Sequence, residues 1–179
     1  MNPQEILKFW FEETTPAQKF KKDAVFDALI RRRFAETQRA AAQGELSEWR
    51  ASTEGRLAEI IVLDQFSRNL FRDDPRAFAC DGMALVLAQE AVRCAADQAL
   101  EPRRRVFLYM PYMHSESRAI HVTAEQLFRR LGIAENLKYE IAHKAIIDRF
   151  GRFPHRNAVL GRKSTPEELE FLSQPNSSF

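Results

Sequence analysis

The chain has 179 residues, of which 45% are hydrophobic and 29% charged, and its formal net charge is +2. This composition is typical of a soluble globular domain that buries roughly 70% of its unfolded surface. The near-neutral charge does not indicate a nucleic-acid binder, and no run approaches the ~20 apolar residues that cross a bilayer. Because the N-terminus also lacks the pattern of a secretory signal, we expect a cytoplasmic protein with no membrane partner.

Apolar residues recur at helical spacing along the whole chain, and no segment has the pattern of a strand. A short amphipathic helix is predicted to begin with Ile6, Phe9 and Trp10, and a longer one is predicted from about residue 20 to its end at Gly44. A third helix is predicted to begin at Thr53 as N-cap and to be apolar on nearly all sides from residue 57 to residue 71. A helix of that kind is expected at the centre of the domain.

Start and stop residues predict the remaining helices. They are a fourth helix beginning at Asp74-Pro75, a fifth from near Pro102 that Pro111 interrupts, a sixth over 116–131 ended by Gly132, a seventh over 134–150 ended by Gly151, and a last short one opened by the capping box Thr165-Pro-Glu-Glu168. The pattern predicts an all-α antiparallel array of seven to nine helices, either a bundle or a solenoid, with no clean 34-residue repeat. We expect a single domain over residues 1–179, with 173–179 as a frayed tail.

The two cysteines are predicted to be free thiols. Cys80 and Cys94 fall on the predicted fourth helix, about 21 Å apart at 1.5 Å per residue. A disulfide requires Cα atoms within about 7 Å, so the pair cannot form while that helix is intact. Free thiols are consistent with a cytosolic protein.

The first candidate constellation is Asp64-Gln65-Phe66-Ser67-Arg68-Asn69. On a helical wheel, Asp64 and Arg68 lie along an apolar stripe of the helix expected to be most buried. Ionised side chains are almost never buried without a partner, and the spacing i, i+4 allows these two to pair. Two interpretations stay open: an internal salt bridge that fixes helix packing, or a helix end that lines a polar pocket.

The second constellation is Tyr109-Met-Pro-Tyr-Met-His-Ser-Glu116. If Pro111 ends a helix, His114 and Glu116 lie near the start of the next one, with Ser115 as its cap. His114 is then a candidate general base that Glu116 orients, or the two share a metal, or the segment serves only for capping and hydrogen bonding. No metal-ligand spacing is present, so we expect no metal and no other cofactor.

The third constellation lies between Asp148 and Arg162, where Arg152, Arg156 and other basic residues outnumber the single nearby acid. Arginine forks beside phenylalanine rings suit a site for carboxylate or phosphate. The anionic partner is either a ligand or the distant acids Asp64 and Glu116. In the alternative interpretation, these arginines cap carbonyls and bridge helices.

With these segments the chain resembles a known family, the domain-of-unknown-function-924 proteins of bacteria and some eukaryotes. The resemblance is carried by Leu63-Asp-Gln-Phe-Ser-Arg-Asn69, the Tyr109–Glu116 segment, Arg149-Phe-Gly-Arg-Phe-Pro-His-Arg-Asn157 and Leu160-Gly-Arg162. It implies a tetratricopeptide-like helical fold and no established activity. The family commonly has glutamine where this chain has His121, and if that position lines a pocket, the ligand preference differs here.

Our leading hypothesis is a polar pocket where the ends of the third and seventh helices approach the His114 segment. His114 or His155 is the candidate acid or base, held by Asp64 or Glu116, and Arg152 and Arg156 clamp a small anionic ligand. The other predicted ligand-binding residues are Gln65, Arg68, Asn69 and Asn157. The competing hypothesis is a non-catalytic helical scaffold that binds a peptide or protein partner, with the polar cluster as an internal brace. Whether the chain is an enzyme or a homodimer stays open.

Overall fold

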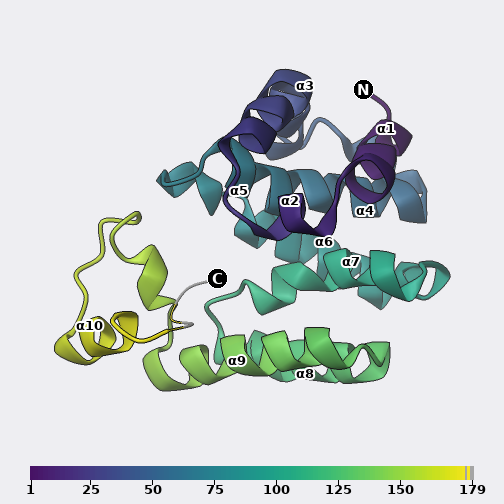
Figure 1. Ribbon diagram of the computed structural model, residues 1–179. Helices are drawn as coiled ribbons and strands as arrows, with labels where there is room; N and C mark the ends of the chain where they lie inside the picture. Colours follow the sequence, from purple (N-terminus) through teal and green to yellow (C-terminus); the bar gives the residue numbers. More distant parts are fainter. Residues whose placement is uncertain (176, 178–179) are drawn as a thin grey trace.

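The computed structural model describes residues 1–175 and 177. Their regular secondary structure is helical and includes no strand (Figure 1), so the predicted all-α class is confirmed. The longer helices are α3 (Ala24–Ala42), α4 (Thr53–Ile61), α6 (Asp81–Arg93), α7 (Pro102–Met113), α8 (Arg118–Leu131) and α9 (Ala134–Phe150). The shorter ones are α1 (Pro3–Lys8), α2 (Pro16–Phe20), α5 (Ser67–Leu70) and α10 (Pro166–Leu172). A π-helical turn, Val62–Phe66, joins α4 to α5 without a break. With residues 53–70 counted as one helix, the described part of the chain holds nine, within the predicted range.

The helices form an array in which neighbours in sequence pack side by side. α7 packs against α6 and α8. A short link at Gly132 connects α8 to α9, and these two helices also pack against each other (Figure 1). On the other side of the array, α4 contacts α1, α6 and α7. The chain beyond α9 turns back at Gly151 and carries α10 past the end of that helix. The closer likeness to tetratricopeptide arrays stays a prediction.

The main core is aromatic and is centred on α4 and its π-helical continuation. Phe66 lies 4.9 Å from Phe34 and 5.6 Å from Trp10 between ring centroids, and Phe9 packs 4.7 Å from Phe34. The side chains from Leu57 to Leu63 have no solvent exposure. The prediction that this helix is buried at the centre of the domain is therefore confirmed.

Several predicted helix ends are confirmed by their backbone geometry. Gly132 and Gly151 end α8 and α9 with φ of +78° and +72°, a left-handed conformation that glycine adopts without a Cβ clash. Thr165 opens α10 with a capping box in which its hydroxyl accepts from Glu168 N. Cys80 and Cys94 flank α6 and are both free.

The predicted break at Pro111 is wrong. α7 continues through the proline to Met113, and His114 N donates to Met110 O at 2.9 Å to close the last turn. Proline removes one hydrogen bond of the helix and crowds the carbonyl four residues before it, which can kink a helix without ending it. His114 is thus the C-cap of α7, and α8 begins later than predicted, at Arg118.

Two other predicted boundaries are also wrong. The segment 20–44 is not one helix, because Asp23 accepts from Val25 N and Phe26 N and starts α3 afresh after α2 ends at Phe20. The residues after Asp74 form only a 3-10 turn, Pro75–Ala77, and α6 starts at Asp81. A cap in the sequence marks a helical start but not how far the helix runs.

Within residues 1–175 and 177, no helix combines the length and apolar character that a membrane span requires. Within the predicted C-terminal tail 173–179, Ser177 Oγ donates to Leu172 O at 3.1 Å. Residues 176, 178 and 179 of that tail lie outside the described residues.

Candidate functional site

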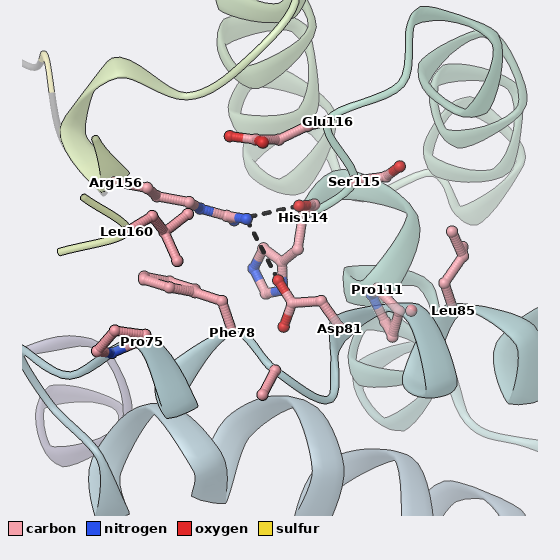
Figure 2. Close-up of a pocket in the computed structure, with 12 residues that line it drawn as sticks. Pro75, Phe78, Asp81, Leu85, Pro111, His114, Ser115, Glu116, Arg156 and Leu160 are labelled. Carbon is pink, nitrogen blue, oxygen red and sulfur yellow. Dashed lines mark hydrogen bonds and ion pairs between the residues drawn. The ribbon is translucent and has the colours of Figure 1, made fainter. Parts of the chain in front are cut away.

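Three segments that are distant in sequence meet at one place, as predicted. Asp64 belongs to the π-helical turn, His114 ends α7, and Arg156 follows α9 in the 3-10 turn Pro154–Arg156. His114 Nδ1 lies 2.7 Å from Asp64 Oδ1, and Arg156 Nη2 donates to His114 O at 3.1 Å (Figure 2).

Asp64 is a fully buried carboxylate with several donors around it. Gln65 Nε2 donates to Asp64 Oδ2 at 2.6 Å, and Arg68 Nη1 lies 3.1 Å from Asp64 Oδ1. Burial alone would raise the pKa of this carboxyl, but Arg68 and His114 outweigh it and hold the pKa well below its usual range. π-helical turns are rare and often occur at functional sites, and this one places Asp64 against the end of α7.

His114 is oriented by Asp64. Because the carboxylate accepts a hydrogen bond at Nδ1, the ring carries its proton there, and Nε2 is left with a lone pair. Burial lowers the pKa of His114 and Asp64 opposes that effect, with the net shift downward. The imidazole is therefore neutral near pH 7, the form in which Nε2 accepts a proton.

Asp81, at the first position of α6, links the two site arginines and is a residue that sequence reasoning missed. Arg68 donates to both of its oxygens at 2.9 and 3.0 Å, and Arg156 Nη1 donates to Oδ2 at 3.2 Å. An acid in the first turn of a helix is usually explained by the helix dipole, so its spacing alone carried no further signal.

Arg156 is a buried cation that uses few of its donors. Its guanidinium lies 4.6 Å from the ring centroids of both Phe78 and Phe153, and its Nε has no hydrogen-bond partner among the described residues. Burial lowers the pKa of Arg156 to about 10, and Arg68 contributes to the shift. Each terminal nitrogen makes one hydrogen bond, so donor capacity remains for a further acceptor.

A pocket of about 360 Å³ opens beside these residues (Figure 2). Its polar wall and its apolar wall face a common space, the usual make-up of a small-molecule site. The lining residues are Pro75, Phe78, Ala79, Asp81, Gly82, Leu85, Pro111, His114, Ser115, Glu116, Arg156 and Leu160.

The structure places Arg152 and Asn157 away from this pocket. Arg152 donates to both oxygens of Glu168 at 2.6 and 2.7 Å and also to Lys163 O, so its fork is already occupied. Asn157 Nδ2 lies 3.3 Å from the same Glu168. The predicted clamp of two arginines is thus reduced to Arg156.

Glu116 lines the pocket but does not orient His114. It accepts two hydrogen bonds from Arg162, at 2.6 and 2.9 Å, and a third from Phe153 N at 2.7 Å. Arg162 lowers the pKa of Glu116 against the effect of burial, which raises it. This ion pair fastens the chain beyond α9 to the start of α8.

Other residues singled out in the sequence also lie outside the pocket wall. Asp64 and Arg68 are among them, and they act on the pocket through His114 and Asp81. Asn69 donates to Asp27 Oδ1 at 2.8 Å, the ring of His155 lies 5.6 Å from that of Phe153, and His121 lies behind the pocket. Gln65 contributes through Asp64 alone. Within residues 1–175 and 177, no group of three or more His, Cys, Asp or Glu side chains is placed to hold a metal ion.

Comparison with known proteins identifies the family. The family described as "Bacterial protein of unknown function (DUF924)" matches residues 6–176. The chain belongs to this family. It is also similar to a solved structure of a protein of unknown function from Agrobacterium tumefaciens, with 40% identity, a TM-score of 0.91 and coverage of 96% of both chains. A search of curated proteins gives no match.

For this DUF924 chain the comparisons establish the fold and supply no reaction. The site must therefore be interpreted from its own geometry.

Proposed function

We propose that the pocket binds a small ligand bearing a carboxylate or a phosphate, with Arg156 as its anchor and His114 as an acid–base group. The proposal is carried by one observation: His114, held by the buried carboxylate of Asp64, shares a pocket wall with a buried arginine that has donors to spare. Titratable groups with shifted pKa values in a concave site are typical of function.

The chemistry of His114 follows from its partner. With Nδ1–H donated to Asp64, Nε2 takes a proton from the ligand or from a water molecule, and the carboxylate stabilises the resulting imidazolium. The same group returns the proton later as a general acid. Proton transfer between His114 and a bound ligand is the reaction class that this arrangement serves.

Arg156 supplies the anion contact. The planar guanidinium group binds carboxylate and phosphate through paired hydrogen bonds. Contacts with the rings of Phe78 and Phe153 fix the orientation of this one. The apolar wall, which includes Leu85 and Leu160, suits a short hydrocarbon portion of the ligand.

The charges around the pocket predict proton uptake on binding. With His114 neutral, three carboxylates balance three guanidiniums in the cluster: Asp64, Asp81 and Glu116 against Arg68, Arg156 and Arg162. An added anion leaves one negative charge uncompensated, and protonation of His114 offsets it. Ligand binding is therefore expected to raise the pKa of His114.

Titration calorimetry with inorganic phosphate and with butyrate tests the proposal. Arg156→Gln is expected to weaken binding by about tenfold or more, since a charge-assisted hydrogen bond contributes about 1.5–3 kcal/mol. Arg149→Gln is the matched control, because Arg149 pairs with Glu167 at an exposed position outside the pocket. Wild-type protein that binds neither probe would contradict the proposal.

A second candidate is the non-catalytic scaffold with an internal brace. It is favoured by the way Arg152 and Arg162 each spend two donors on one carboxylate. On this account Arg156→Gln lowers the melting temperature of the ligand-free protein by breaking a buried charge pair, at about 3–5 kcal/mol. No small anion then stabilises the wild type.

A further inference from the structure

We infer that the buried pair His121–Glu140 is a positioning device for the segment 114–117, which carries His114 and Glu116 into the pocket. The inference rests on the proposed function, because it concerns the residues that this function uses. It assigns a role to two side chains that do not touch the pocket.

His121 connects the helix pair to the segment at two points. Its Nε2 lies 2.9 Å from Ser115 O, and its backbone N donates to Ser117 O at 3.1 Å. On the other side of the ring, Nδ1 lies 2.8 Å from Glu140 Oε1 on α9. The carbonyl of Ser115, between His114 and Glu116, is thus fixed by the ring of His121, and Glu140 on α9 holds that ring in place.

Both contacts of the ring are hydrogen bonds only if the pair holds two protons. A neutral imidazole has one N–H and an ionised carboxylate has none. With that single proton, the ring donates either to Ser115 O or to Glu140 Oε1, and in the other contact two lone pairs face each other. With a second proton, Nε2–H donates to Ser115 O and one further proton lies between Nδ1 and Oε1. The position of the segment therefore depends on the protonation of a pair outside the pocket.

The surroundings favour retention of the second proton. Both side chains have no solvent exposure, and Glu140 Oε2 has no hydrogen-bond partner among the described residues, an arrangement that disfavours a carboxylate anion. The charged and titratable groups facing the pair are Glu125 from α8 and Lys144 and His143 from α9. Burial raises the pKa of Glu140, His121 lowers it, and the net shift is upward.

The test follows the ring nitrogens of His114 by NMR in protein labelled with ¹⁵N-histidine, without any ligand. In the wild type near pH 7 we expect a proton on Nδ1, bonded to Asp64, and a bare Nε2. His121→Leu removes the donor to Ser115 O and is expected to abolish this signature. His121→Gln, whose amide N–H reaches the same carbonyl, is expected to keep it.

Glu140→Gln separates positioning from protonation. Its amide donates to Nδ1 of a neutral His121 with no titratable proton, so the His114 signature should persist to a higher pH than in the wild type. Tyr109→Phe is the control for general destabilisation. Tyr109 lies on α7 away from the segment 114–117, and the substitution removes its buried hydrogen bond to Asp97.

Unchanged His114 signals in folded His121→Leu, or loss of them in Tyr109→Phe to the same extent, would overturn the inference. Binding of butyrate adds a second readout, with an expected loss of about tenfold in His121→Leu from misplacement of His114. If the wild type binds neither phosphate nor butyrate, the proposed function fails while the ring signals still decide the role of His121.

Discussion

The main core and the chain beyond Gly151 are held together by different forces. The main core joins α1 and the helices from α3 to α8 through large apolar side chains, among them the aromatic group around Phe66. The C-terminal segment has only a small apolar cluster around Phe153 and depends on ion pairs such as Arg162–Glu116. Yet this segment supplies Arg156 and Leu160 to the pocket.

This difference indicates that the pocket wall supplied by the C-terminal segment is held less firmly than the wall supplied by the main core. Apolar burial is insensitive to pH and salt, whereas ion pairs with partly exposed members weaken when either partner is neutralised or screened. Conditions that leave the main core intact should therefore loosen the wall that carries Arg156 first. The predictions below test this contrast, from the largest expected effect to the smallest.

Phe66→Ala should destabilise the whole domain. Phe66 is fully buried against Trp10 and Phe34, and truncation of such a ring costs about 3–5 kcal/mol. Urea denaturation followed by circular dichroism measures the loss. Phe171→Ala, in the small C-terminal cluster, is the control with a smaller expected effect, and equal losses in the two variants would remove the contrast.

Acidification should act on the C-terminal segment through the two histidines that contact Phe153, one on α9 and one in the segment itself. His143 and His155 lie 5.7 and 5.6 Å from the Phe153 ring, and burial lowers their pKa values to about 3 and about 4. The unfolded chain takes up these protons below its ordinary pKa of about 6.5 while the folded chain does not, so stability falls from that pH toward pH 4.

A steady fall of the melting temperature over this window is expected from thermal melts at a series of pH values. His143→Gln should flatten the slope between pH 6.5 and pH 4. A second decline starts only below the unfolded pKa of Glu168. Arg152 lowers the folded pKa of this carboxyl to about 2, so the stability that the pair contributes is lost as the pH falls from the unfolded to the folded value. A melting temperature independent of pH from 7 to 4 would contradict the account.

Arg162→Met should release the C-terminal segment without unfolding the main core. The substitution removes two charge-assisted hydrogen bonds to Glu116, at a cost of about 1–2 kcal/mol in a partly exposed pair. Hydrogen exchange is expected to accelerate in residues 151–172 and to stay unchanged in α4. Uniform acceleration along the chain would show that the segment and the core unfold together.

Arg149→Gln should have the smallest effect. Its salt bridge to Glu167 is about half exposed, and such pairs contribute about 0–1 kcal/mol. A shift of the melting temperature as large as that of Arg162→Met would mean that exposure does not separate the two kinds of ion pair.

Much of the fold could be predicted from local signals. Gly132, Gly151 and the capping box at Thr165 act over a few residues, and the apolar spacing of α4 reports burial directly. The break predicted at Pro111 failed because a proline weakens a helix only locally, whereas the packing of α7 against α6 and α8, which the sequence does not show, keeps the helix formed to Met113.

The candidate site could be predicted only in part. The unusual density of charge in the segments of Asp64, His114 and Arg156 marked them as related, and they meet. The acids that satisfy the other arginines could not be foreseen, since pairing of Arg152 with Glu168 depends on how the chain turns back after α9. Asp81 was missed for the same reason, because its two arginine partners come from other elements.

The most direct test of the central claim is the ¹⁵N signal of His114 Nε2 during a titration with butyrate at constant pH. The account predicts that this nitrogen becomes protonated as the anion binds, and that Arg156→Gln abolishes the response while Arg149→Gln retains it. A titration in which butyrate leaves the His114 signal unchanged, or shifts it equally in Arg156→Gln, would contradict the account.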